Sequence, residues 1–296
     1  MSTLSPGLWG ILATPFTGPD RAVDVESLRK EVRFFAGIPA TGLVALGVFG
    51  EGAALDTREQ AEVTRTVVDA AGGIPVVVGL SARTTAVAVE QARSAVTAAQ
   101  GSLAALMVQV NSPDPDVVVP HLEAIHAATG TDIVIQDYPV ASGVHIGADQ
   151  LVSVVRRCPF TAAVKSEAPP TSLAIARLTE AVDVPVFGGL GGVGLLDELS
   201  AGAAGAMTGF SHPEGLLAAL QAFDEGGFTA AREAFAPWLP MANFEAQPGI
   251  GLALRKEVLR RRGVIAESLV RPPAKALPAH VADLIDAHLD TTPAKD

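Results

Sequence analysis

The chain has 296 residues, of which 49% are hydrophobic and 18% are charged. These proportions are typical of a compact globular protein and exclude an intrinsically disordered one. A formal net charge of −11 argues against nucleic acid or an anionic membrane as a partner, since both need a basic surface. A small anionic ligand remains possible, because a few local groups decide the field inside a cleft.

Cys158 is the only cysteine, which excludes an internal disulfide and a cluster of thiolate metal ligands. The first ten residues, MSTLSPGLWG, lack the basic and apolar regions of a secretory signal. Apolar runs such as LVALGVFG are too short to span a bilayer. We therefore expect a soluble protein of the reducing cytoplasm, with no membrane partner.

Short apolar runs alternate with longer segments of helical period as far as about residue 225. Most of the runs are continuously apolar, as in strands that are covered on both faces. The intervening segments begin with residues that cap helices, among them Asp24, Asp56 and Thr84. The predicted strands are residues 8–15, 42–48, 75–80, 104–110, 132–137, 161–165, 184–188 and 205–208.

Eight strand–helix units in succession predict a closed (β/α)8 barrel over residues 1–226. An open dinucleotide-binding sheet would need a glycine fingerprint after the first strand, where this chain has ATPF. Residues 227–296 predict further helices, at 229–241, 249–262 and 278–289. No linker precedes this segment, so we expect a helical extension of the same domain.

In such a barrel, function lies where the strands end. Lys165 stands at the end of the sixth predicted strand, in a run with no other charge. Loss of hydration there favours the free amine that attacks a ketone. The alternative is a structural lysine that pairs with Glu167 or reaches the surface, and placement at a strand end makes the two interpretations about equally weighted.

Tyr138, the only tyrosine, follows the fifth predicted strand in IVIQDYPV. Its phenol is suited to moving a proton between an amine and a substrate carbonyl. Its alternative role is a half-buried ring with a hydrogen-bonded hydroxyl. Proximity to Lys165 on the next strand favours the catalytic role.

The remaining candidates carry weaker signals. The glycines of GVFGEG and GGLGG permit close backbone approach to a ligand, or only tight loops, and neither sequence has the lysine of a nucleotide-binding loop. The six histidines show no metal-ligand spacing, so no metal is expected. His212 and Glu214 either line the cleft or simply begin a helix. The run from Arg260 to Arg262 predicts a solvated helix end.

Four motifs now stand in order at the ends of the first, second, fifth and sixth predicted strands: GILATPF, GVFGE, DYP and VKSE. Their order and spacing resemble the dihydrodipicolinate synthase/N-acetylneuraminate lyase family. Each motif alone is weak, but four in register are specific. The likeness extends from about Leu8 to Pro213, and the helical tail is similar in character.

The resemblance implies a Schiff-base-forming aldolase, lyase or dehydratase that acts on pyruvate or a related 2-oxo acid, with an aldehyde as a possible second substrate. It implies that Lys165 carries the imine and Tyr138 shuttles the proton, without a cofactor. It also implies a homotetramer or a dimer. The substrate-binding residues that it implies are Gly47, Val48, Phe49 and Gly50 for the carboxylate, with Gly189 and the backbone of Met207 beside them.

The chain departs from the family's lysine-pathway synthases at three places. Val48 and Phe49 stand where GTTGE-type loops have two hydroxyl groups, and Val110, Asn111 and Ser112 replace a tyrosine-bearing turn. The arginine expected shortly after Pro139 is absent as well. These departures argue against 4-hydroxy-tetrahydrodipicolinate (dihydrodipicolinate) synthase activity, which is retained as an alternative. A second alternative is a non-catalytic homologue that binds 2-oxo acids or regulates.

Overall fold

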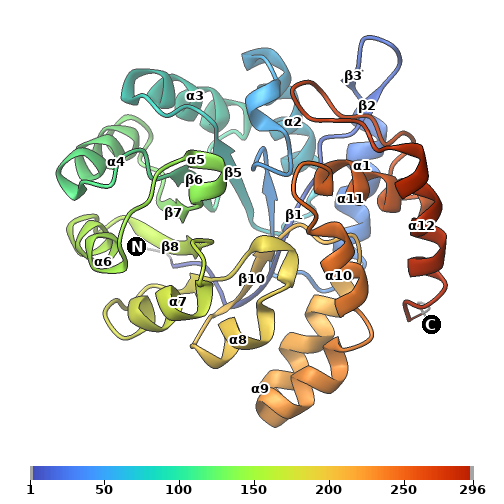
Figure 1. The fold of residues 1–296 in the computed structure, drawn as a ribbon. Coiled ribbons are helices and arrows are strands. Elements are labelled where there is room, and N and C mark those ends of the chain that lie inside the picture. The colour runs from blue at the N-terminus through green and yellow to red at the C-terminus, as the bar shows by residue number, and fades with distance from the viewer. Residues whose placement is uncertain (1–2, 294–296) are drawn as a thin grey trace.

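Eight parallel strands form the centre of the molecule and helices surround them, as Figure 1 shows. This computed structural model describes residues 3–293. The sheet order is β10-β1-β4-β5-β6-β7-β8-β9, and a bridge between Gly188 and Ala206 joins its two edges. The predicted (β/α)8 fold is therefore confirmed. The strands are β1 (Gly7–Ile11), β4 (Gly42–Ala45), β5 (Val76–Leu80), β6 (Ala105–Gln109), β7 (Ile133–Asp137), β8 (Thr161–Ser166), β9 (Val186–Phe187) and β10 (Gly205–Thr208).

A helix follows each barrel strand and packs on the outside of the barrel. Asp24 and Asp56 cap the first two of these helices through their side chains, as their positions predict. A short hairpin, β2 (Phe16–Thr17) and β3 (Ala22–Val23), was not predicted. The helices are α1 (Val25–Ala36), α2 (Thr57–Ala70), α3 (Thr85–Ala98), α4 (Pro115–Thr129), α6 (Ala148–Arg157), α7 (Thr171–Thr179), α8 (Leu195–Ser200) and α9 (Pro213–Phe235). Single turns lie between some strands and helices: η1 (Gly52–Ala54), α5 (Pro139–Ser142) and η2 (Leu190–Gly192).

Alternate residues along each strand belong to two separate apolar cores. The larger core lies between the strands and the helices and includes Leu43, Ile135 and Val164. The smaller core fills the barrel interior with side chains such as Trp9 and Phe187. Side chains alternate between the two faces of a strand, so the residue two positions after an interior residue also points into the barrel. This alternation directs the side chains near the strand ends into the mouth of the barrel.

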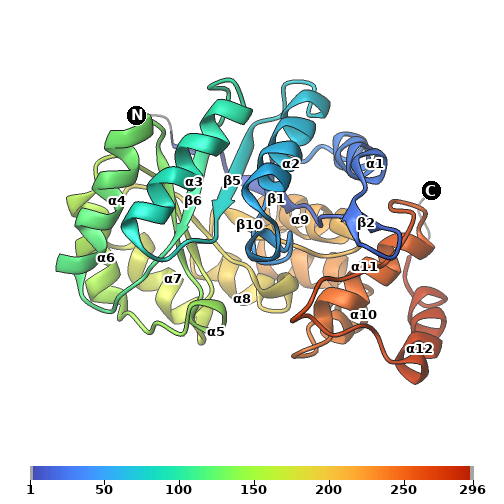
Figure 2. The same cartoon turned by 90° about the horizontal axis from the view of Figure 1, so that it is seen from above.

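The chain ends with α10 (Leu239–Glu245), α11 (Gly251–Arg261) and α12 (Ala279–Leu289). In Figure 2, α10 and α11 lie on the same side of the barrel as α5, which follows the carboxyl end of β7. The predicted single helix at 229–241 is wrong, because α9 ends at Phe235 and Pro240, which lacks an N–H donor, lies at the start of α10. The expected boundary at residue 226 falls beside Gly227, which interrupts α9 with a φ of 67°.

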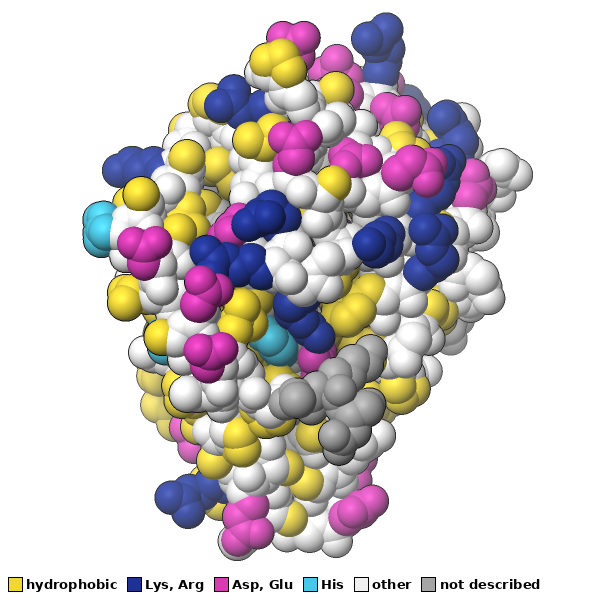
Figure 3. Space-filling model, turned by 90° about the vertical axis from the view of Figure 1, so that its right-hand side faces the viewer, with side chains coloured by type: hydrophobic (Ala, Val, Ile, Leu, Met, Phe, Trp, Pro, Cys, Tyr) yellow, Lys and Arg dark blue, Asp and Glu magenta, His cyan; other side chains and the backbone are white. Residues whose placement is uncertain are grey.

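The outer face of this C-terminal segment carries mixed charge. Figure 3 shows Lys and Arg side chains interspersed with Asp and Glu on it. Arg260 and Arg261 both pair with Glu257, and Arg262 pairs with Glu214. The predicted solvated helix end is thus only partly correct, because the Arg262 side chain is 14% exposed and lies over the ring of Phe34.

Glu31 is a carboxyl residue of α1 that is fully buried and contacts the chain just after β1. Its Oε1 accepts a hydrogen bond from the N–H of Ala13 at 2.9 Å, while its Oε2 has no partner among residues 3–293. Burial raises the pKa of this carboxyl from 4.5 to about 8. The folded state therefore holds the Glu31 proton far more tightly than the unfolded chain does.

Glu31→Gln should reduce the dependence of stability on pH. With a pKa raised in the folded state, the wild type loses stability as pH rises from about 5 to 8, because the unfolded chain ionises first. The free energy of unfolding, measured in urea at both pH values, should fall by roughly 3 kcal/mol less in the variant than in the wild type. The exposed Glu62→Gln serves as the control. An equal fall in wild type and variant would contradict the assigned protonation of Glu31.

Candidate active site

Lys165 lies near the carboxyl end of β8, with its side chain inside the barrel. Ala163, two residues earlier on the same strand, belongs to the interior core, so alternation directs Lys165 inward. In the sheet Lys165 pairs with Gln136 of β7 and Phe187 of β9. Only 5% of the residue is exposed. The strand therefore presents a buried amine at the mouth of the barrel.

Glu167 is the acidic partner of Lys165. The Nζ of Lys165 lies 3.3 Å from the Oε2 of Glu167, and both side chains are almost fully buried. Gln136 donates to the same Oε2 at 2.7 Å, and the N–H of Leu190 donates to Oε1 at 3.2 Å. The pairing expected of a purely structural lysine is thus present, but it lies inside the barrel mouth. Buried and oriented by two donors, the carboxylate is placed to exchange a proton with the amine.

Tyr138 lies just beyond the end of β7, at the start of α5. The strand residue beside Lys165 is Gln136, so Tyr138 is one inward-facing position farther toward the mouth. Burial and the Glu167 carboxylate raise the pKa of the Tyr138 phenol, while Arg255 lowers it. The hydroxyl is therefore protonated at neutral pH and acts first as a donor.

A cavity of about 600 Å³ joins these residues at the carboxyl ends of the strands. Lys165, Glu167, Gln136 and Tyr138 line one part of it. Its volume is within the usual range for small-molecule sites. The sequence-based prediction that Lys165 and Tyr138 share one cavity agrees with this geometry.

The loop after β4 contributes Val48 and Phe49 to the cavity wall. None of the hydrogen bonds found in residues 3–293 uses the N–H of Val48, Phe49 or Gly50 as donor. Thr14 fixes the loop by donating its hydroxyl to the carbonyl of Gly50 at 2.6 Å. Val48 and Phe49 line the cavity, so their free N–H groups are available for a carboxylate, as the resemblance implies for this loop. Gly47 and Gly50 themselves lie behind the wall, against Met107 and the backbone of Leu46.

Gly189 and Met207 also lie outside the cavity wall. A Cβ atom at Gly189 would stand 2.2 Å from the Oε1 of Glu167, so the glycine makes room for that carboxylate. Met207 is fully buried in the interior core, and its N–H donates to the carbonyl of Gly188. Their predicted contact with substrate remains a prediction. Beside them, Thr208 supplies a hydroxyl to the cavity and accepts from the N–H of Gly191 at 2.7 Å.

The C-terminal helices supply residues that the sequence did not point to. Glu245, Gln247, Leu252 and Arg255 line the cavity from α10, α11 and the loop between them. The Nε of Arg255 lies 3.5 Å from the Oε2 of Glu245. No sequence motif marks these residues, because they come within reach of Lys165 only when the extension folds over the barrel mouth. Part of the cavity wall therefore comes from outside the (β/α)8 barrel.

A buried ion pair holds this extension in place. Lys256, next to Arg255 on α11, is fully buried and forms a close ion pair with Glu51 of the loop after β4. Lys256 also donates to the carbonyl of Leu269 at 2.8 Å, and Glu51 accepts from the N–H of Arg271 at 2.8 Å. Burial lowers the pKa of Lys256, and the nearby Glu51 carboxylate opposes that shift. The same loop thus bears the predicted carboxylate site and the anchor of α11.

Other candidates lie away from the cavity. His212 directly precedes α9, is buried between Phe210 and Trp238, and is not part of the cavity wall. Burial and the nearby Arg262 lower its pKa to about 3. Asp137 lies outside the cavity wall, and burial raises its pKa to about 6. Within residues 3–293, no group of His, Cys, Asp and Glu side chains is arranged to hold a metal ion, and no helix is long and apolar enough to cross a membrane.

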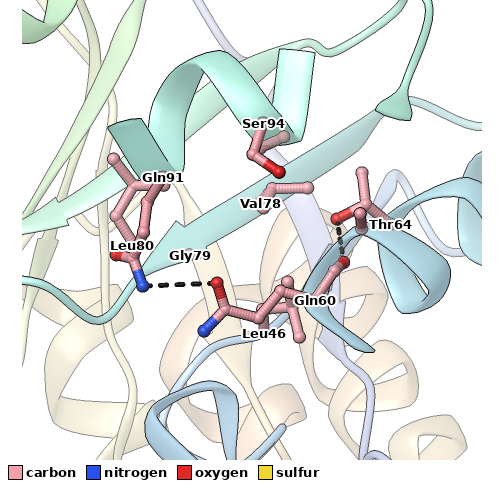
Figure 4. Close-up of a pocket in the computed structure, with 10 residues that line it drawn as sticks. Leu46, Gln60, Thr64, Val78, Gly79, Leu80, Gln91 and Ser94 are labelled. Atoms are coloured by element: carbon pink, nitrogen blue, oxygen red, sulfur yellow. Dashed lines mark hydrogen bonds between the residues drawn. The ribbon is translucent and has the colours of Figure 1, made fainter. Parts of the chain in front are cut away.

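A second, much smaller hollow lies outside the barrel between α2 and α3 (Figure 4). Its volume of about 10 Å³ is near the minimum for one water molecule. Gln91 donates to the side chain of Gln60 at 3.3 Å across it, and Thr64 donates to the Gln60 carbonyl. It has no titratable side chain in its wall, so the barrel mouth is the candidate active site.

A (β/α)8 barrel with a buried lysine at its carboxyl mouth fits the class of Schiff-base-forming lyases. Comparison with known proteins agrees. Residues 5–290 match the model of the dihydrodipicolinate synthetase family. The L-2-keto-3-deoxyarabonate dehydratase of Azospirillum brasilense is 30% identical over 284 residues, covering 92% of this chain and 89% of that protein. The 4-hydroxy-tetrahydrodipicolinate synthase of Kineococcus radiotolerans is 29% identical over 279 residues, with the same coverage.

A solved structure of dihydrodipicolinate synthase from Rhodopseudomonas palustris superposes with a TM-score of 0.89 at 27% identity. The alignment covers 98% of this chain and all of that one. The chain belongs to the dihydrodipicolinate synthetase family. This membership confirms the predicted family and the predicted lyase class.

Lys256→Met should destabilise the protein by about 3–5 kcal/mol, because it leaves the Glu51 carboxylate buried without its partner. Urea unfolding measures the change, and the exposed Lys30→Met should stay within about 0.5 kcal/mol of wild type. The double variant Glu51→Leu/Lys256→Met should recover much of the loss, since an apolar pair leaves no buried charge. A loss in Lys256→Met no larger than that of Lys30→Met would show that the ion pair does not fasten the extension.

Proposed function

We propose that the protein dehydrates 2-oxo-3-deoxy sugar acids through a Schiff base on Lys165. The observation that carries this proposal is the contact of 3.3 Å between the Lys165 amine and the Glu167 carboxylate inside the cavity. Dehydration uses a single substrate and needs one base beside the imine. The similarity to a 2-keto-3-deoxyarabonate dehydratase supports the same reaction class.

The reaction begins when the free amine of Lys165 attacks the C2 carbonyl of the substrate. The carbinolamine then loses water to give the imine, and the Tyr138 hydroxyl donates the proton that the leaving oxygen needs. The position of Tyr138 in the cavity wall supports this step. The carboxylate of the substrate is held by the free N–H groups after β4. A positively charged imine nitrogen makes the neighbouring C3–H bond acidic.

Glu167 then removes a proton from C3, and the electrons of that bond move into the C2–N system to form an enamine. The enamine expels the C4 hydroxyl, which leaves as water after taking a proton from the Glu167 carboxylic acid. Hydrolysis of the resulting unsaturated imine frees Lys165 and consumes one water molecule, which balances the one released when the imine formed. The net change is the loss of one water molecule, without any oxidant or reductant.

Two other reactions use the same imine. Aldol addition of pyruvate to an aldehyde, the class to which 4-hydroxy-tetrahydrodipicolinate synthase belongs, needs a proton relay to the second substrate. Val48 and Phe49 provide no hydroxyl for such a relay, which favours dehydration. A screen of 2-oxo-3-deoxy sugar acids and aldehydes separates the reactions by product. Dehydration yields the substrate mass less one water, whereas cleavage releases pyruvate and addition consumes it.

We also propose that the chain works in the cytoplasm as a homo-oligomer, a tetramer or a dimer. Two observations support this proposal. Cys158 is buried and unpaired, which suits a reducing compartment. Val140 and Leu173 are 75% and 69% exposed, so apolar surface remains on the isolated chain.

Borohydride should trap pyruvate or a 2-oxo-3-deoxy sugar acid on Lys165, because reduction makes the imine permanent. Peptide mass spectrometry should find the adduct on Lys165 in the wild type and in Lys30→Ala, and no adduct in Lys165→Ala. Circular dichroism checks that Lys165→Ala is folded. Absence of an adduct with every 2-oxo acid tried would refute the Schiff base and favour a non-catalytic binding protein.

Exchange of the pyruvate methyl protons in D2O, followed by NMR, should identify the base. Glu167→Gln should slow this exchange by about 10²–10⁴-fold, because an amide cannot accept the C3 proton. Glu62→Gln, exposed on α2, is the matched control. Exchange at the wild-type rate in Glu167→Gln would assign the proton to another group.

Tyr138→Phe should leave imine formation possible but lower turnover by about 10²–10⁴-fold, since it removes one general acid. Turnover is measured on the sugar acid that the screen identifies. An unchanged rate would show that Tyr138 carries no proton and is only part of the cavity wall.

A further inference from the structure

Arg255 faces the cavity with its hydrogen-bonding capacity unused. A guanidinium group has five N–H donors. The Nε of Arg255 lies at ion-pair distance from Glu245, 3.5 Å, yet no hydrogen bond found in residues 3–293 uses any of the five donors of Arg255. The other arginines of α11, Arg260 and Arg261, and Arg262 directly after it are all engaged by carboxylates. Within residues 3–293, Arg255 is therefore a cavity cation with one ion pair at Nε and no hydrogen bond from its terminal nitrogens.

The surroundings of Arg255 fix its orientation. Glu245 is fully buried and accepts from both the N–H and the hydroxyl of Ser211, so two hydrogen bonds hold the carboxylate that faces Nε. The ring of Phe49 lies 5.6 Å from the guanidinium carbon. A Cβ atom at Gly191 would stand 2.5 Å from the Nη2 atom, so the glycine leaves room for the group. Held from its Nε side, the guanidinium has its two terminal nitrogens free.

The charged residues that line the cavity form two ion pairs, and the one at Arg255 uses only the Nε of the guanidinium. Lys165 is paired with Glu167 deep in the mouth, whereas Glu245 faces Arg255 and is itself occupied by Ser211. The cavity of about 600 Å³ extends from Lys165 to Arg255 and exceeds what pyruvate alone would fill. Two terminal guanidinium nitrogens match the two oxygens of a carboxylate or a phosphate.

We propose that Arg255 binds a second anionic group, a carboxylate or a phosphate, at the end of the substrate remote from the 2-oxo group. This inference rests on the proposed Schiff base at Lys165, which fixes the first end. The substrate class is then a 2-oxo acid with two anionic ends, such as a 2-oxo-3-deoxy aldaric acid or a phosphorylated 2-oxo-3-deoxy sugar acid. Arg255 selects the substrate by its tail and takes no part in proton transfer.

The test compares tails on one 2-oxo acid scaffold. Borohydride trapping is titrated with 2-oxoglutarate, 2-oxopentanoate and 2-oxo-4-phosphonobutanoate, which end in a carboxylate, a methyl and a phosphonate. The longer pair of 2-oxoadipate and 2-oxohexanoate allows for a more distant subsite. Wild type should be half-saturated by an anionic tail at a concentration about 10- to 100-fold lower than by the neutral tail. The carboxylate and phosphonate arms show which anion is preferred.

In Arg255→Gln, compounds with anionic and neutral tails should be half-saturating at nearly the same concentration. Arg65→Gln, which removes an exposed charge on α2, should keep the wild-type ratio of these concentrations. Arg255→Lys keeps the positive charge but loses the paired N–H donors of the guanidinium, so it should give an intermediate ratio. It replaces Arg255→Gln in the test if that variant does not fold. No preference in wild type at either chain length, or a preference that survives in Arg255→Gln, would overturn the proposal.

Calorimetric binding of the same compounds, without borohydride, separates this proposal from the proposed function. If pyruvate gives no adduct but anionic tails bind through Arg255, the Schiff base fails and the anion subsite stands. If pyruvate gives the adduct and Arg255→Gln changes neither titration, the Schiff base stands and the subsite fails.

Discussion

The close ion pair between Glu51 and Lys256 determines how the active-site cavity is completed. It links the loop after β4, which carries the free N–H groups, to α11, which carries Arg255. Both charges are buried, so the pair is costly to break and tolerates little movement of either element. The (β/α)8 barrel supplies the lysine and the base, while the extension held by this pair supplies the opposite wall. Chemistry and substrate selection are thus built from separate parts of the chain.

Three residues near Lys165 position the carboxylate of Glu167. Gln136 donates to Glu167 from β7, Leu190 donates from the loop after β9, and Gly189 keeps clear the volume that the carboxylate occupies. These three contacts come from the strands and loops on either side of β8, so the position of Glu167 depends on the closed ring of strands. A carboxylate fixed in this way needs little reorganisation when it accepts a proton.

The fold and the lysine could be predicted because their signals are local. Continuous apolar runs and caps such as Asp56 mark strands and helices, and the end of a run marks the barrel mouth, where Lys165 lies. Glu167 was visible only as a possible structural partner, because sequence does not tell whether such a pair lies inside or outside a cavity. Arg255 could not be predicted at all, since its place depends on how α11 docks more than 200 residues from Glu51. The sequence suggested that Gly189 contacts a ligand, yet the Glu167 side chain is what requires a glycine at this position.

The scarcity of aromatic hydroxyls has a practical consequence. Tyr138 is the only tyrosine in the chain and lines the cavity, and both tryptophans, Trp9 and Trp238, are buried away from it. A single labelled tyrosine therefore gives one NMR resonance that reports directly on cavity occupancy, without assignment of the remaining spectrum. The same ring absorbs in the ultraviolet differently when a neighbouring charge is added or neutralised. The protein thus contains its own spectroscopic probe of each step at Lys165.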